Sequence, residues 1–257
     1  MSELRPATGT ALVTGATAGI GHEFARQLAA RGHDLVLVAR DTERLGSVAT
    51  KLSATYAVEV EVLPADLTDR DQLMSVEQRV ADRDRPVELV VNNAGFGLKR
   101  RFLDNDVEDE QAMLDILVIA VMRVSHAALG AMTERGHGGI INVSSVAASL
   151  PRGSYAAAKS WVNSFGAWAS AEYRKRGITV TTLCAGFTKT EFHQRMDVRR
   201  GSGFMWMEPE FLVSHALADF DKGRSFSTPG LHYRAITAAT KLVPTRVLQR
   251  FQSVGRK

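Results

Sequence analysis

Short apolar segments alternate with longer segments of helical period along most of this chain, and this alternation constrains the fold more than any other feature. The short segments are rich in Val, Ile and Leu, as expected of strands buried on both faces of a parallel sheet. Six such strands are predicted, at residues 10–14, 35–39, 58–63, 87–92, 139–144 and 178–184. Helices are predicted between them, at residues 21–31, 41–55, 69–82, 106–135 and 154–176. The order predicts an α/β fold, with one doubly wound, mostly parallel sheet and helices on both faces.

The remaining sequence fits one domain of this kind. The 257 residues contain no linker rich in Pro, Gly or Ser and no internal repeat, so a single domain is expected across residues 1–257. The alternation is less regular after residue 184. A helix is expected from Glu208, because Pro209 suits a first helical turn, and a last helix is expected near residues 232–240. A basic tail follows at residues 241–257.

The charge pattern argues against nucleic-acid binding. The formal net charge of +4 is spread over the chain instead of forming one basic face or tail. Small basic clusters at residues 99–101 and 199–200 are interpreted as solvated surface, or as contacts for an anionic cofactor or substrate.

Cysteine content and hydropathy indicate a cytoplasmic protein. Cys184 is the single cysteine, which excludes an internal disulfide and fits a reducing compartment; its apolar surroundings predict a buried, inert thiol. The N-terminus lacks the pattern of a signal peptide. The longest apolar run, residues 116–122, is too short to cross a bilayer, so no integral membrane segment is expected.

A glycine-rich turn connects the first predicted strand to the first helix. Such a turn lets the backbone approach a pyrophosphate closely, and the N–H groups of the following helix then hold the anion. Glycines occur in many turns between strands and helices, but this position directly after the first strand favours dinucleotide binding. The candidate cofactor-binding residues here are Thr14, Gly15, Thr17, Ala18, Gly19, Ile20 and Gly21.

The end of the second strand favours NADP(H) over NAD(H). A carboxylate there would bind the ribose 2′-hydroxyl of NAD, but Ala39 occupies this position and Arg40 follows. A guanidinium can bind a 2′-phosphate through a charge-assisted contact worth roughly 1.5–3 kcal/mol. Two other interpretations remain: Arg40 starts a helix at the surface, or the neighbouring Asp41 reaches the ribose of NAD. Asp66 and Leu67 follow the third strand, where Asp66 could accept from the adenine amino group or cap a helix.

Tyr155 and Lys159 lie four residues apart at the start of a predicted helix, so they share one helix face. A free tyrosine has a pKa of about 10, too high for a general base near neutrality. A nearby cation favours the phenolate and would lower the pKa of Tyr155 by roughly two to three units. Alone, this spacing is common on solvated helix faces.

Further motifs accompany this pair in a fixed order, and together they resemble the short-chain dehydrogenase/reductase family over roughly residues 8–190. Besides the glycine turn, Asp66, Tyr155 and Lys159, the matching residues are Asn92, Asn93, Ala94, Gly95, Ser145, Gly186, Thr188 and Thr190. The resemblance implies a single Rossmann-type domain that oxidises or reduces alcohol and carbonyl groups, often as a homodimer or homotetramer through the helices at 106–135 and 154–176.

The resemblance also implies a role for each matching residue. Tyr155 would be the general acid and base, and Ser145 would orient the substrate oxygen, with Ser144 as its rival. Lys159 would lower the pKa of Tyr155 and hold the nicotinamide ribose. Residues 92–95 would shape the cofactor pocket, while Gly186, Thr188 and Thr190 would meet the nicotinamide end.

Three features depart from the family pattern. Leu117 occupies the position of an asparagine that anchors a water in the family's proton relay, and Ala185 replaces a proline. Only ten positions separate Ser145 from Tyr155, about three fewer than usual, so the intervening loop is short. The relay must therefore use another group or bulk water, or turnover is weak.

Residues 187–225 are expected to form a substrate lid and a helix. Their aromatic and Met side chains favour a hydrophobic substrate, or else cover the core or a neighbouring subunit. His193 is a candidate polar contact, and Trp161, Phe165 and Trp168 are expected in the core or a subunit interface. We therefore predict an NADP(H)-dependent oxidoreductase. The alternatives are an NADP(H)-binding sensor or scaffold with little turnover, and a protein whose basic C-terminus binds membrane surfaces.

Overall fold

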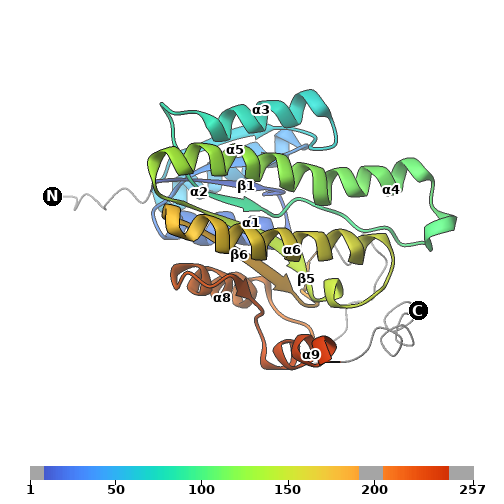
Figure 1. Cartoon of the computed structure of the whole chain (residues 1–257). Coiled ribbons are helices and arrows are strands. Elements are labelled where there is room, and N and C mark those ends of the chain that lie inside the picture. The colour runs from blue at the N-terminus through green and yellow to red at the C-terminus, as the bar shows by residue number, and fades with distance from the viewer. Residues whose placement is uncertain (1–8, 191–204, 243–257) are drawn as a thin grey trace.

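A computed structural model describes residues 9–190 and 205–242. Seven parallel strands form one sheet in the order β3-β2-β1-β4-β5-β6-β7 (Figure 1). The strands are β1 (Thr10–Thr14), β2 (Asp34–Ala39), β3 (Val60–Pro64), β4 (Val87–Asn92), β5 (Gly138–Ser145), β6 (Ile178–Ala185) and β7 (Phe226–Ser227). The predicted doubly wound α/β fold is confirmed, and the six predicted strands differ from the observed ones only at their ends. The sequence prediction missed β7, because two residues are too few to show a strand pattern.

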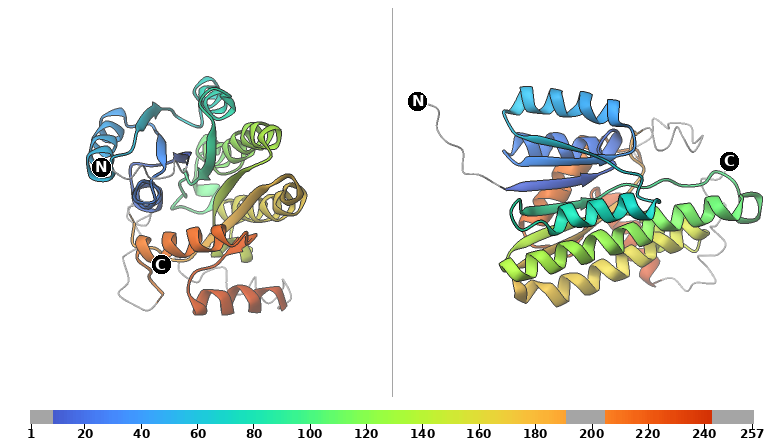
Figure 2. Two further views of the ribbon diagram at one scale, coloured as in Figure 1. Left: turned by 90° about the vertical axis from the view of Figure 1, so that its left-hand side faces the viewer. Right: turned by 90° about the horizontal axis from the view of Figure 1, so that it is seen from above.

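Helices cover both faces of this sheet (Figure 2). Helices α1 (Gly19–Ala30), α2 (Thr42–Tyr56), α8 (Pro209–Asp221) and α9 (Leu231–Leu242) pack on one face. Helices α3 (Arg70–Ala81), α5 (Ala120–Arg135) and α6 (Ser154–Tyr173) pack on the other. The shorter elements are α4 (Val107–Leu114), the 3-10 turns η1 (Phe102–Asp104), η3 (Val146–Ser149) and η4 (Arg174–Arg176), and the π-helical η2 (Asp115–Ile119).

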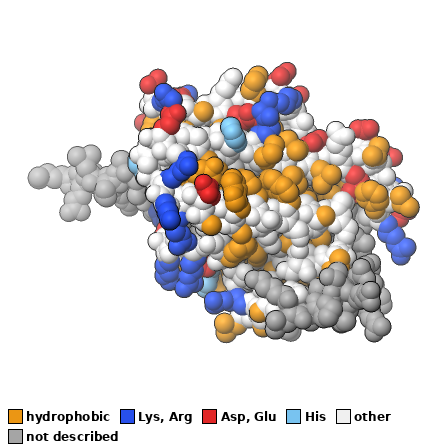
Figure 3. Space-filling view, viewed as in Figure 1, with side chains coloured by type: hydrophobic (Ala, Val, Ile, Leu, Met, Phe, Trp, Pro, Cys, Tyr) orange, Lys and Arg blue, Asp and Glu red, His pale blue; other side chains and the backbone are white. Residues whose placement is uncertain are grey.

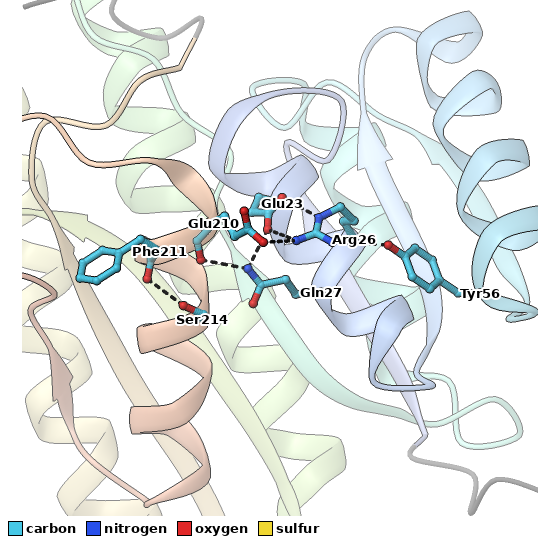
Figure 4. A network of polar contacts seen from close by, with 7 residues as sticks. All are labelled: Glu23, Arg26, Gln27, Tyr56, Glu210, Phe211 and Ser214. Atoms are coloured by element: carbon cyan, nitrogen blue, oxygen red, sulfur yellow. Dashed lines mark hydrogen bonds and ion pairs between the residues drawn. The ribbon is translucent and has the colours of Figure 1, made fainter. Parts of the chain in front are cut away.

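The helix starts follow the capping signals of the sequence. Asp41 caps α2 by accepting from the Arg44 N–H at 2.9 Å, and Asp69 caps α3 in the same way. Pro209 occupies the first turn of α8, as predicted. Side-chain contacts then join α8 to α1: Arg26 contacts both Glu23 and Glu210, and Gln27 donates to the Glu210 carbonyl (Figure 4).

Helix α4, η2 and α5 form one continuous helical run of 29 residues, Val107–Arg135, where a single helix was predicted. An 18-residue window within it has a mean hydropathy of 1.8, so by length and composition this run could cross a membrane. The shortness of the apolar run 116–122 therefore does not by itself exclude a membrane-spanning helix. Of that window, 44% is buried within the protein, where the run packs on α3, α6 and the sheet. The lack of a membrane segment stays a prediction.

Some sequence predictions lie outside the described residues. These are His193 and the rest of the expected lid at residues 191–204, which includes the basic cluster at 199–200, and the tail from residue 243 onward.

Candidate active site

A cavity of about 490 Å³ opens at the carboxyl ends of the strands, where parallel α/β sheets bind their ligands. Every candidate cofactor-binding and catalytic residue lines this cavity except Thr14, Gly21 and Asn92, whose amide donates to Ser125 and Asn142 behind the sheet end. The residues that the sequence prediction did not assign to it include Arg44, Phe96, Ile116 and Val143. A volume of this size suits a cofactor or drug-sized ligand.

Thr14 and Gly21 stabilise the glycine turn from outside the cavity. The Thr14 hydroxyl donates to the Val91 carbonyl at 3.3 Å and accepts from the Asn93 and Ala94 N–H groups, each at 3.0 Å. At Gly21 a Cβ would lie 2.2 Å from the Gly15 carbonyl oxygen, so helix α1 can approach the turn only without a side chain there. Thr14 and Gly21 therefore shape the turn and do not face the cavity.

The end of the cavity beside β2 carries two arginines. Arg40 is 70% exposed, and its Nη1 lies 3.6 Å from Oδ2 of Asp66. Arg44, the first-turn residue of α2 that Asp41 caps, also lines the cavity. Because the Asp41 carboxylate accepts this capping bond, it has a structural function that does not require a ribose.

Asp66 is held by several groups at once. Its Oδ1 accepts from the Thr68 N–H at 3.0 Å and from the Thr68 hydroxyl at 2.8 Å. Partial burial raises the pKa of the Asp66 carboxyl, but these hydrogen bonds and the charge of Arg40 lower that pKa below its usual value overall. Asp66 is thus ionised at neutral pH. Helix α3 is capped by Asp69 instead.

The opposite end of the cavity brings Ser145, Tyr155 and Lys159 together. Ser145 ends β5, and its side chain hydrogen-bonds Tyr155 near the start of α6. The Lys159 ammonium, one turn further along α6, donates to the Val143 carbonyl at 2.7 Å. Ser144, the rival of Ser145, is buried and donates to the Lys159 carbonyl at 3.1 Å, which fixes α6 against β5. The geometry therefore favours Ser145 over Ser144 as the hydroxyl beside the phenol.

Burial sets the proton affinities of this pair. It raises the pKa of Tyr155 to about 12, against a smaller lowering by the hydrogen bond from Ser145. It lowers the pKa of Lys159 to about 8. The expectation that Lys159 lowers the pKa of Tyr155 is not met in this structure, because desolvation dominates both groups. The phenol is accordingly protonated at neutral pH and suited to donate a proton.

Leu117 lies beside Tyr155, as its position in the sequence pattern predicted. The π-helical η2 turns it inward, where it is 1% exposed and packs with Met113 and Ala158 against Tyr155. A Cβ on Gly95 would lie 2.5 Å from Cδ2 of Leu117, so the two residues are in close contact at the cavity wall. The leucine makes this wall apolar where a polar group was expected.

Tyr233 on α9 stabilises the segment that follows β6. No sequence motif indicated this function. Its hydroxyl accepts from the Phe187 N–H at 2.8 Å and donates to the Met205 carbonyl at 2.6 Å. Its ring fills the space above Gly186, where a Cβ would lie 2.1 Å from Cε2 of Tyr233. The cavity-lining residues Gly186 and Thr188 are thereby fixed by the C-terminal helix.

Comparisons with known proteins identify the family of this chain. The short chain dehydrogenase family matches residues 9–200. An uncharacterized oxidoreductase of Mycobacterium tuberculosis is 29% identical over 247 residues, which cover 93% of this chain and 96% of that protein. Sulfoacetaldehyde reductase 2 of Chromohalobacter salexigens is 36% identical over 186 residues, or 70% of this chain and 73% of that protein.

Solved structures are similar over nearly the whole chain. A short-chain dehydrogenase from Sphingobium yanoikuyae in complex with NADPH has a TM-score of 0.85 and 32% identity, covering 96% of both chains. The bulky-bulky ketone specific alcohol dehydrogenase from Comamonas testosteroni has a TM-score of 0.80 and 28% identity, covering 92% of this chain and 93% of that one. This chain belongs to the short-chain dehydrogenase/reductase family of oxidoreductases.

Proposed function

We propose that this protein transfers hydride between NADP(H) and a carbonyl or alcohol group of a small hydrophobic substrate. The observation that carries the proposal is the placement of Ser145, Tyr155 and Lys159 at one end of a cavity whose other end presents Arg40 and Arg44. The nicotinamide cofactor, when bound, supplies or accepts the hydride. The cavity fits such a group: it is long enough to join a glycine turn at a helix N-terminus with a proton-donating pair.

The proton chemistry follows from the half-buried Tyr155 and the buried Lys159. In the reductive direction the Tyr155 phenol, protonated because burial raises its pKa to about 12, donates its proton to the developing alkoxide. The Ser145 hydroxyl, which hydrogen-bonds Tyr155, orients the same oxygen. The Lys159 ammonium, with a pKa of about 8, remains mostly charged at neutral pH and lies one turn along α6 from Tyr155, where it faces the same end of the cavity.

Substitution of Tyr155 tests this assignment. Tyr155→Phe removes only the hydroxyl, so we expect NADPH oxidation with aldehydes, ketones or quinones to be lost while NADPH binding is retained. Tyr173→Phe, at the far end of the same helix, is the matched control. Full turnover by Tyr155→Phe would refute the proton-donor role. Tight NADPH binding by the wild type, with no turnover on any of these compounds, would favour the sensor alternative that Leu117 motivates.

The preference for NADP(H) rests on the two cavity arginines. Arg40 is exposed and paired with Asp66 only at 3.6 Å, so its guanidinium is accessible to a 2′-phosphate. Arg40→Ala should weaken NADPH binding by about ten- to a hundredfold, with little change for NADH. Arg31→Ala, whose side chain pairs with Asp221 instead, is the control. Equal losses for NADPH and NADH would contradict the preference.

The hydrophobic substrate is proposed from the cavity wall near Tyr155. Phe96, Ile116 and Leu117 line that part of the cavity, and Leu98 packs beside them. The named activities of the relatives differ in substrate, one acting on bulky ketones and another on sulfoacetaldehyde. The apolar side chains of the cavity wall in this chain favour a hydrophobic substrate.

We further propose that the protein forms a homodimer or homotetramer through α5 and α6. These helices run side by side, and apolar side chains gather over them (Figure 3). Trp168 is 53% exposed and Met122 is 39% exposed, so Trp168 belongs to the surface and not to the core. Trp161 and Phe165 stack on the same helix with ring centroids 5.0 Å apart.

The cytoplasmic location of the protein stays a prediction.

A further inference from the structure

A buried carboxylate lies beside the start of the helix that carries the proton-transfer pair. Glu110 belongs to α4 and is only 6% exposed. Its Oε2 accepts from the Ser154 hydroxyl at 2.5 Å, and its Oε1 accepts from the Asn105 side-chain amide at 2.7 Å. Neither the sequence motifs nor the proton chemistry described above uses this residue. A buried glutamate requires such partners, since an unsatisfied carboxylate would be strongly destabilising.

The position of Ser154 gives this contact its importance. Ser154 is the first residue of α6 and Tyr155 is the second. The preceding residue, Gly153, has φ of 92° and supplies no side-chain cap. The first turn of any helix leaves N–H groups without intrahelical partners and carries a partial positive charge. A carboxylate bonded to the first side chain of α6 therefore places negative charge near the positive end of this helix.

Glu110 also joins two other segments of the site to α6. Asn105 ends the connection that leaves β4 and contributes Phe96 to the cavity wall. Helix α4 continues directly into η2, which carries Leu117. One carboxylate thus links the cavity wall, the η2 helix and the start of α6. A shift of any of these segments would change the direction in which the Tyr155 hydroxyl points.

We propose that Glu110 is a positioning residue, which fixes the first turn of α6 and thereby the hydroxyl of Tyr155 through its hydrogen bonds with Ser154 and Asn105. The proposal rests on the proposed function only for the role of Tyr155. Displacements of about 1 Å can reduce an enzymatic rate by about a hundredfold, so loss of this contact has a measurable effect.

Steady-state kinetics of Glu110→Ala and Ser154→Ala test the proposal. The reaction followed is NADPH oxidation with an aldehyde, ketone or quinone that the wild type reduces. We expect each variant to lower kcat by at least about tenfold, with the Kd for NADPH within about twofold of wild type, because neither residue lines the cofactor end of the cavity. The double variant should lose no more than the larger single loss, because both remove the same hydrogen bond. Glu110→Gln keeps an acceptor oxygen and should restore most of kcat. Glu108→Ala, an exposed residue of the same helix, is the matched control and should retain wild-type kcat.

Each outcome decides the proposal. Wild-type kcat in Ser154→Ala, or additive losses in the double variant, would overturn it even if Glu110→Ala failed to fold. Faster amide exchange at residues 155–157 in Ser154→Ala, with an unchanged unfolding midpoint, would support a local positioning role. A global loss of stability with normal kcat would instead show a purely structural role. If Tyr155→Phe keeps full activity, the proposed function fails regardless of these results, so the two failures are distinguishable.

Discussion

Replacing Lys159 by Met should change how the stability of this fold depends on pH. Burial lowers the pKa of Lys159 to about 8, whereas in the unfolded chain the ammonium has its ordinary value of 10.5. Between these two values the unfolded state binds more protons than the folded state. The free energy of unfolding therefore rises with pH in this window. The stabilising contribution is fully present above the unfolded pKa, and it is lost as the pH falls through about 8.

The size of this pH effect on stability follows from the shift in the pKa of Lys159. The difference between 10.5 and about 8 corresponds to about 3 kcal/mol, at about 1.4 kcal/mol for each pKa unit. Integration between about pH 7 and about pH 9.5 gives about 2 kcal/mol of this total. Tyr155 has the opposite sign, because burial raises its pKa to about 12 from 10.0, but it acts only above this range.

Urea unfolding of the wild type and Lys159→Met at these two pH values measures the contribution. The wild type should gain about 2 kcal/mol more than Lys159→Met on going from about pH 7 to about pH 9.5. Lys51→Met, which removes an exposed lysine, should follow the wild type. The lost hydrogen bond to the Val143 carbonyl also changes the stability of Lys159→Met, so the measured quantity is the difference between the two pH values and not the absolute stability. Equal pH responses in wild type and Lys159→Met would refute the reasoning, since they would mean that the ammonium is not desolvated in the fold.

Two further predictions concern residues outside the proton-transfer pair. Tyr233→Phe leaves the Phe187 N–H without its acceptor and the Met205 carbonyl without its donor, so it should lower the free energy of unfolding by about 2–4 kcal/mol in urea denaturation. A change below about 0.5 kcal/mol would mean that water replaces both contacts. Trp168→Glu places a charge on the apolar face of α6 and should shift the protein towards monomers in analytical ultracentrifugation. An unchanged sedimentation coefficient from an oligomeric wild type would place the interface elsewhere.

The sequence predicted the fold and the two ends of the site from local patterns. Strands buried on both faces show as apolar runs, and caps such as Asp41 and Asp69 act within a few residues of themselves. The glycine turn is equally local, because Gly21 must be small to pack against Gly15. Tyr155 and Lys159 share a helix face by their spacing alone. Each of these statements needs only the geometry of one element.

The sequence could not predict contacts between distant segments. Arg44 lines the cavity because β2 and α2 place it there, and Tyr233 holds Gly186 from a helix nearly fifty residues further along the chain. Glu110 lies 44 residues from Ser154, and no spacing rule joins the two. The expected effect of Lys159 on Tyr155 failed for a related reason: their spacing indicated charge attraction, whereas the surrounding protein desolvates both groups.

By itself, the sequence determined that this chain forms a parallel α/β sheet with a dinucleotide-type turn and a Tyr155–Lys159 face, because hydrophobic period, glycine and helix spacing are properties of neighbouring residues. Only the tertiary structure decided the proton affinities of that pair, the apolar wall at Leu117 and the buried contact of Glu110 with Ser154. These depend on which segments exclude water from a group, and the chain acquires that property only when its segments pack together.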